Sequence, residues 1–273
     1  MAKFDKTYNN ISADDLRFLL CNVDVFNKEV EDFTPWLNEN QKKLFSGDLN
    51  TIAWAPLYEL SFNECLLNFF LQSGLTNELV EIVHADNKIH AAYHFHQNLD
   101  QTIDKVSAGL SEEQRPSYIL NTLCYGVVMM KNAHSLMVFG HYINDLVAIA
   151  RSASDSKSRD EALFKAIRID ASVVCCQTAL SRISKAVLLN DAEFMKALNN
   201  AIAGKLGARE DKTFKKMRFI LQALHESGGI NFSDKELVEL FVKQLKLVSD
   251  TKFTSEKNIG EFARNFKNKK STI

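Results

Sequence analysis

The sequence predicts an all-α protein, and three features lead to this prediction. Glycine occurs 10 times and proline 3 times in 273 residues, whereas an all-β protein needs both at its many turns. Apolar residues recur three and four positions apart, for example at Leu16, Leu20 and Val23, which is the period of an amphipathic helix. Apolar residues make up 46% of the chain and charged residues 25%, as in ordinary folded proteins.

Helix start and end signals divide the first part of the chain. Ser12 stands three residues before Asp15, a pattern that favours a helix start at Ser12. Thr34 and Pro35 predict a second, short helix that begins at Pro35, since proline is tolerated in the first turn, and ends near Gly47. Pro56 predicts the start of the next helix, which we expect to end at Gly74.

Three long helices are predicted next, over residues 76–107, 116–152 and 160–189. A short link of six residues, 110–115, joins the first two, so we expect them to pack as an antiparallel hairpin. The Ser-rich stretch 151–159 is predicted to be a loop. These features predict an up-down bundle of long helices over 1–189, followed by a compact group of short helices over 190–273.

The two predicted domains differ in charge. Residues 205–273 contain 15 Lys and Arg against 9 Asp and Glu, a net charge of +6. The whole chain has a net charge of −1, so residues 1–204 carry about −7. We therefore expect an acidic helical bundle and a basic C-terminal domain.

The sequence favours a cytoplasmic protein that does not contact a membrane. No secretory signal is visible at the start, and Lys131 and Asp145 interrupt the most apolar stretch, 120–150. The five cysteines are odd in number, form no C-x-x-C motif and lie in apolar helical stretches. Buried free thiols in a reducing compartment explain this pattern better than disulfides.

Histidines on the predicted hairpin form a candidate metal site. His90 and His94 are four residues apart on one helix, so both imidazoles point to the same side, as zinc ligands do. The opposing helix carries His134 and His141, which the hairpin brings to a similar level. The alternative is that these histidines are surface or packed residues on the flank of the apolar seam. No cofactor other than such a divalent metal is indicated.

The last predicted helix, 255–268, carries an apolar face and many cations. Ile259, Phe262 and Phe266 form the face that would dock. A helix-turn-helix reader of nucleic acid uses such a layout, with Lys and Arg contacting phosphates. The predicted phosphate-contacting residues are Lys252, Lys257, Arg264, Lys267, Lys269 and Lys270.

Asn258, Arg264, Asn265 and Asn268 are candidates to read bases on the same helix. The alternatives are a solvated terminal helix, whose cations suit a helix C-terminus, or a basic helix that neutralises the acidic part of the chain.

No phosphate-binding glycine loop or nucleophile motif occurs in the sequence. We therefore expect a non-enzymatic interaction or regulatory protein that binds a protein partner or a second copy of itself. Its basic C-terminal helices would contact an acidic partner such as nucleic acid. The alternative function is that of a metal-dependent helical-bundle enzyme that uses the histidines of the hairpin.

Overall fold

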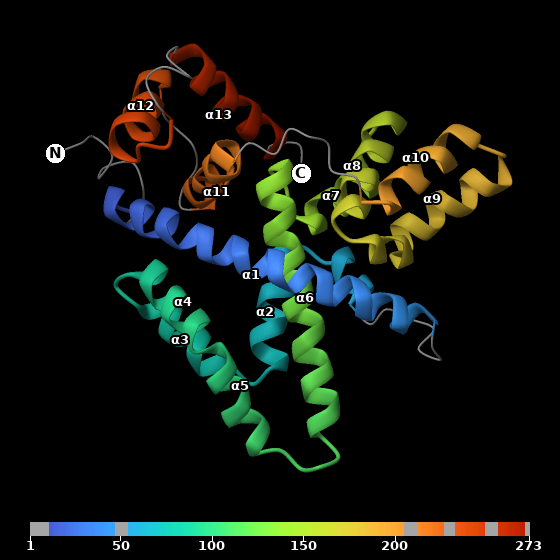
Figure 1. Ribbon diagram of the computed structural model, residues 1–273, viewed down its shortest axis with the longest axis horizontal. Coiled ribbons are helices and arrows are strands. Elements are labelled where there is room, and N and C mark those ends of the chain that lie inside the picture. The colour runs from blue at the N-terminus through green and yellow to red at the C-terminus, as the bar shows by residue number, and fades with distance from the viewer. Residues whose placement is uncertain (1–10, 47–53, 205–211, 227–232, 249–255, 271–273) are drawn as a thin grey trace. The chain divides into compact units, whose positions relative to one another are not determined.

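A computed structural model of the chain describes residues 11–46, 54–204, 212–226, 233–248 and 256–270. Within these ranges it contains 13 α-helices and no strand, so the protein is all-α, as the sequence predicts (Figure 1). Contacts group the chain into two units. Unit 1 comprises residues 1–35, 134–141 and 206–273, and unit 2 comprises 36–133 and 142–205. The division into 1–189 and 190–273 stays a prediction.

Two long helices contribute to both units. The first is α1, Ala13–Ser46, and the second is α6, Arg115–Phe139. The predicted helix start at Pro35 is wrong, because α1 continues through this proline. Proline favours a first turn but also occurs inside helices, where it removes one backbone hydrogen bond. The contact grouping divides α1 at this same residue.

The other elements of unit 2 are short helical segments. They are η2 (Ala55–Glu59), α2 (Phe62–Gln72), α3 (Thr76–His84), α4 (Lys88–Gln97), α5 (Leu99–Ala108), α7 (Ile143–Ser152), α8 (Ser156–Ile169), η3 (Ala171–Cys175), α9 (Gln177–Leu188) and α10 (Ala192–Ile202). Both η2 and η3 are 3₁₀ turns.

Each of the three long helices predicted for residues 76–189 is therefore interrupted, and side-chain caps explain two of the breaks. The Asn87 side chain accepts a hydrogen bond from the His90 backbone N–H at 3.0 Å and starts α4. The Asp170 side chain accepts from the Ser172 backbone N–H and starts η3. Gly140, with φ +79°, follows the end of α6. The apolar period continues across such a cap, because the helices before and after it present apolar faces to the same core. The sequence pattern alone therefore does not show the break.

The α2 helix packs against α5 and α6, and Figure 1 shows it next to the middle of α6. Phe69 lies 6.3 Å from Tyr125 of α6, and Phe70 lies 5.2 Å from Phe95 of α4, measured between ring centroids. Leu99 and Val106 of α5 pack against the same buried cluster. The core of this part of unit 2 is thus built around α2.

Unit 1 is assembled from the start of α1, the end of α6 and the C-terminal helices. These helices are α11 (Lys212–Glu226), α12 (Asp234–Val238), the π-helical η4 (Glu239–Gln244) and α13 (Glu256–Lys270). The predicted cap at Ser12 is present, with its hydroxyl accepting from the Asp15 backbone N–H at 3.0 Å. The buried core of the C-terminal helices consists of Met217, Ile220, Leu221, Leu224, Leu237, Leu240, Phe241, Ile259, Ala263 and Phe266.

Candidate functional sites

The α12–α13 pair of unit 1 has the layout that the sequence predicts for a basic terminal helix. Ile259, Ala263 and Phe266 are 0%, 2% and 5% exposed, so the apolar face of α13 is docked on its own unit. Arg264 and Lys267 lie on the exposed side. Cations at these positions face solvent because the apolar residues, three and four positions apart, fix the rotation of the helix.

An ion pair joins the two helices of this pair. Arg264 Nη1 donates to Asp234 Oδ1 at 2.6 Å and to Asp234 Oδ2 at 2.8 Å. The hydrogen bonds to Asp234 raise the pKa of Arg264. Gly260, one turn before Arg264, makes this approach possible. A Cβ at that position would overlap the Asp234 carboxylate, so the absence of a side chain at Gly260 leaves room for the carboxylate next to α13.

The other predicted phosphate-contacting residues are only partly placed. Lys252 lies outside the described residues. Lys257, Lys269 and Lys270 belong to α13, but their side chains are outside the described set. Asn258, Asn265 and Asn268, the candidates for base reading, are exposed on the same helix as Arg264.

Cations of α11 are instead used within unit 1. Lys216 pairs with Asp24 of α1 at 2.7 Å. Arg218 donates from Nη1 to the Met137 carbonyl at 2.7 Å, near the end of α6, where a positive charge suits the helix dipole. Desolvation lowers the pKa of Arg218. Part of the positive charge of the C-terminal segment is therefore used in contacts within unit 1.

The four histidines of the candidate metal site fall in different units. His90 and His94 are exposed on α4 of unit 2, whereas His134 and His141 belong to unit 1, with His141 buried. Across the residues that the structure describes, no three His, Cys, Asp or Glu side chains are arranged to hold a metal ion. The described residues of the two units therefore include no ligand set to which zinc could be assigned.

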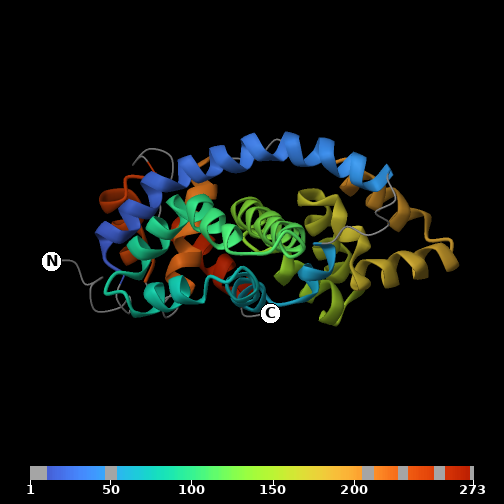
Figure 2. The same cartoon turned by 90° about the horizontal axis from the view of Figure 1, so that it is seen from below.

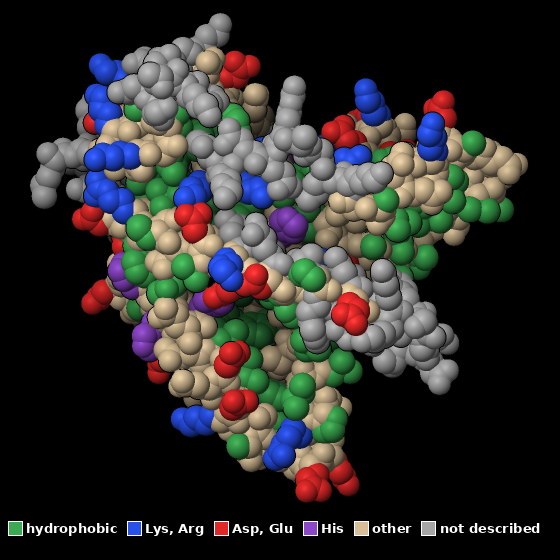
Figure 3. All heavy atoms as spheres, in the orientation of Figure 1, with side chains coloured by type: hydrophobic (Ala, Val, Ile, Leu, Met, Phe, Trp, Pro, Cys, Tyr) green, Lys and Arg blue, Asp and Glu red, His purple; other side chains and the backbone are tan. Residues whose placement is uncertain are grey.

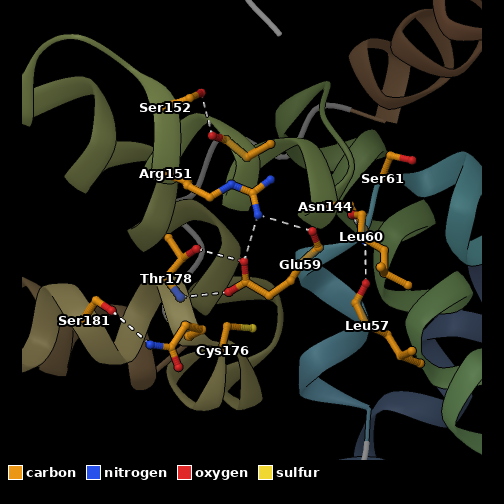
Figure 4. A network of polar contacts seen from close by, with 12 residues as sticks. Leu57, Glu59, Leu60, Ser61, Asn144, Arg151, Ser152, Cys176, Thr178 and Ser181 are labelled. Atoms are coloured by element: carbon orange, nitrogen blue, oxygen red, sulfur yellow. Dashed lines mark hydrogen bonds and ion pairs between the residues drawn. The ribbon is translucent and has the colours of Figure 1, made fainter.

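A polar network around η2 joins distant segments of unit 2 (Figure 4). Glu59 accepts from the Thr178 backbone N–H at 2.8 Å, from the Thr178 hydroxyl at 2.9 Å and from Arg151 Nη1 at 3.2 Å. The N-cap residue of α9, Cys176, makes no side-chain cap. Glu59 therefore caps α9 from a distant part of the chain, where its negative charge suits the helix N-terminus.

Buried side chains satisfy the backbone carbonyls of η2. Asn144 Nδ2 donates to the carbonyls of Leu57 and Leu60, at 2.8 Å in each case (Figure 4). The Cys176 thiol donates to the Ala55 carbonyl at 3.0 Å. Because a buried carbonyl without a partner is costly, these contacts account for a buried asparagine and a buried thiol without any catalytic role.

Asp170 is the buried carboxylate of the same region, 1% exposed. It accepts from the Tyr58 hydroxyl at 2.7 Å and from Trp54 Nε1 at 3.1 Å. Burial and the neighbouring Asp170 raise the pKa of Tyr58 well above its usual value. Buried Lys131 donates to the Ile169 carbonyl at 3.2 Å, and desolvation lowers its pKa.

Sequence reasoning missed this network, because Tyr58 and Asp170 are 112 positions apart. The one sequence signal was an unusual set of polar residues in apolar stretches, Lys131 and Asn144 among them. The polar atoms of the network bond to one another inside the core, so it has the features of a structural centre.

An apolar turn between α9 and α10 is the most exposed hydrophobic feature of unit 2. Val187, Leu188 and Leu189 are 58%, 82% and 66% exposed. Figures 1 and 2 place this turn at the free end of the α9–α10 pair, and Figure 3 shows hydrophobic side chains gathered over α9. Exposed apolar residues that lie together are typical of interaction surfaces.

Comparison of the chain with protein-family models, with curated protein sequences and with solved structures finds no match. Of the helices that the structure describes, none is long and apolar enough to span a membrane.

Proposed function

We propose that this chain is a non-enzymatic interaction protein that contacts nucleic acid through the α12–α13 pair of unit 1. The observation that carries the proposal is the orientation of α13. This helix buries its apolar side and turns Lys267 outward, beside the exposed ion pair of Arg264 with Asp234, in a segment with a net charge of +6. A docked helix that presents cations to solvent offers a rigid surface to a phosphate backbone.

The neighbouring helix extends this surface. Lys235 of α12 and Lys246, which follows η4, are exposed, and Figure 3 shows Lys and Arg side chains over α12. Lys243 is also exposed but pairs with Glu239 at 2.8 Å. Positive side chains thus come from α12, η4 and α13 of one unit, which favours an extended anionic partner over a small anion.

The test is binding of the full-length chain to labelled duplex DNA across a salt series. Lys257, Lys267, Lys269 and Lys270 are replaced together by glutamine, which keeps the helix and removes four charges. We expect the logarithm of the association constant to fall linearly with the logarithm of salt for the natural chain. The slope should be smaller for the variant by about 0.9 for each phosphate that the variant no longer neutralises.

A control variant removes two positive charges from unit 2. Lys185 and Lys196 are exposed on α9 and α10 of unit 2, and their replacement by glutamine should leave the slope unchanged. The proposal fails if the natural chain does not bind at low salt. It also fails if the α13 variant binds like the control.

The apolar turn of α9 and α10 supports a protein partner or a second copy as an additional contact. Burial of a leucine contributes about 2 kcal/mol, so Leu188 and Leu189 together would dominate such an interface. Sedimentation velocity of the natural chain and of the double variant Leu188→Ser, Leu189→Ser tests self-association. A natural chain that stays monomeric over the accessible concentrations would exclude a second copy as the occupant.

The alternative of a metal-dependent enzyme makes a separate prediction. Such an enzyme should purify with near-stoichiometric metal and lose it when His90 and His94 are replaced. Metal analysis of the purified chain decides this, and a metal-free preparation after growth with added zinc would count against the enzyme.

A further inference from the structure

The ion pair between Asp234 and Arg264 gives Arg264 a role different from that of the neighbouring lysines. We infer that α13 is a recognition helix in which Arg264, held by Asp234, reads a guanine edge in the major groove of duplex DNA. This inference rests on the proposed contact with nucleic acid and specifies its chemistry.

The Asp234 carboxylate offsets the charge of Arg264. Both Asp234 oxygens lie within hydrogen-bonding distance of the same nitrogen, Nη1 of Arg264, so the carboxylate offsets the positive charge of the guanidinium. A neutral pair adds little to the attraction of a phosphate backbone, which depends on net positive charge. Arg264 is therefore a poor phosphate contact, although it is the exposed arginine of the helix.

The Arg264 guanidinium has hydrogen-bond donors that Asp234 does not engage. A guanidinium has five N–H donors in a fixed fork, and Asp234 engages only Nη1. Within the described part of unit 1, Nε and Nη2 of Arg264 have no acceptor, and the side chain is 54% exposed. Two adjacent donors in one plane match the N7 and O6 acceptors of guanine, the commonest target of arginine in the major groove.

The ion pair also restricts the Arg264 side chain. A long arginine side chain on a surface samples many rotamers, and ordering it on binding costs free energy. Here Asp234, 34% exposed at its side chain, fixes the guanidinium before any ligand arrives. Gly260 leaves the space that the Asp234 carboxylate occupies next to α13.

The exposed side of α13 indicates the type of nucleic acid. Asn265 and Asn268 are exposed beside Arg264 and one turn further along α13, and asparagine pairs with adenine in the same groove. The B-DNA major groove admits an α-helix, whereas the major groove of A-form RNA is too narrow to read. Duplex DNA is therefore the partner that this helix fits.

The experiment is selection of preferred sequences from a duplex DNA library with a randomised centre, using the full-length chain. We expect the natural chain to enrich sites with a fixed guanine. Arg264→Lys keeps the charge and loses the fork, so it should lower the preference for that guanine about tenfold. Its salt slope on random duplex should stay the same.

Two further variants separate recognition from a structural role. Asp234→Asn should weaken the guanine preference and tighten binding to random duplex, because the Arg264 charge is no longer neutralised. Lys267→Gln should lower the salt slope by about 0.9 and leave the preferred sequence unchanged. If the ion pair had only a structural role, its removal would lower the affinity for all sequences alike. Far-UV circular dichroism checks that each variant is folded.

The outcomes distinguish the two proposals. If the natural chain binds no duplex at low salt, the proposed function fails and this inference fails with it. If it binds without sequence preference, or if Arg264→Lys keeps the guanine preference, only the reading role of Arg264 is refuted. A guanine preference that disappears in Arg264→Lys and weakens in Asp234→Asn supports the inference.

Discussion

The same substitution, glycine to alanine, should have opposite effects on stability at two helical positions. Gly126 lies in α6 and Gly260 in α13. A Cβ at Gly126 would have no described heavy atom within 4 Å, whereas a Cβ at Gly260 would overlap the Asp234 carboxylate. The two positions share the backbone conformation of a helix and differ in what lies next to it.

The magnitudes follow from this difference. Alanine is favoured over glycine in a helix interior by about 1 kcal/mol, so Gly126→Ala should stabilise unit 2 by up to that amount. Gly260→Ala has the same intrinsic gain but must displace Asp234, at the cost of about 1–3 kcal/mol typical of overpacking, and it also loses the ion pair to Arg264. We therefore expect Gly260→Ala to be destabilising by about 1 kcal/mol.

Urea unfolding followed by far-UV circular dichroism measures both changes, and hydrogen exchange on α13 peptides shows whether the loss is local to unit 1. The sharper control is a double-mutant cycle. In an Asp234→Ala background there is no carboxylate to displace, so Gly260→Ala should become neutral or stabilising there. The reasoning is refuted if Gly260→Ala alone is as stabilising as Gly126→Ala.

Three further predictions concern the rest of the chain. Asp170→Ala should destabilise unit 2 by about 3 kcal/mol, measured by urea unfolding, because the buried Tyr58 hydroxyl and the Ser172 backbone N–H lose their acceptor. The backbone N–H of Phe194 and then Arg182 lower the pKa of Asp191 from 3.8. The stability that Asp191 contributes is therefore complete above about pH 4 and is lost as the pH falls through the lowered value. Asp191→Asn should flatten that acid limb of the stability curve. A thiol reagent should modify exposed Cys21 in the folded chain and spare Cys65, which is buried with its pKa raised to about 11. Rapid modification of Cys65 in the folded chain would contradict its burial.

The fold class was predictable because it depends on local patterns. The low glycine and proline content predicts helices. The helical period of Leu16, Leu20 and Val23 predicts a buried helix face, and these three side chains are buried. The lengths of the helices were not predictable from the same period. Asn87 and Asp170 act as N-caps in the middle of apparently continuous runs, and an apolar period cannot distinguish one long helix from two that share a core.

The candidate sites were predictable only where one helix carries them. The buried face of α13 and the exposed Arg264 follow from its 3–4 spacing. The partner of Arg264 is Asp234, 30 positions earlier, and nothing local to either residue indicates the pair. The cysteines show the same limit. Cys65, Cys124 and Cys176 are buried as expected, but Cys21 is exposed, because an apolar neighbourhood in sequence does not fix which face of a helix a residue occupies.

The capping of α9 by Glu59 has a consequence for the order in which unit 2 folds. The carboxylate that completes the first turn of α9 comes from 119 positions earlier in the chain, so local sequence does not stabilise that turn. Closing so long a loop is entropically costly, and contacts of this kind slow folding. The N-terminal turn of α9 should therefore form late in folding, after η2 has packed against η3. Truncation of Glu59 should then speed unfolding and leave the refolding rate nearly unchanged.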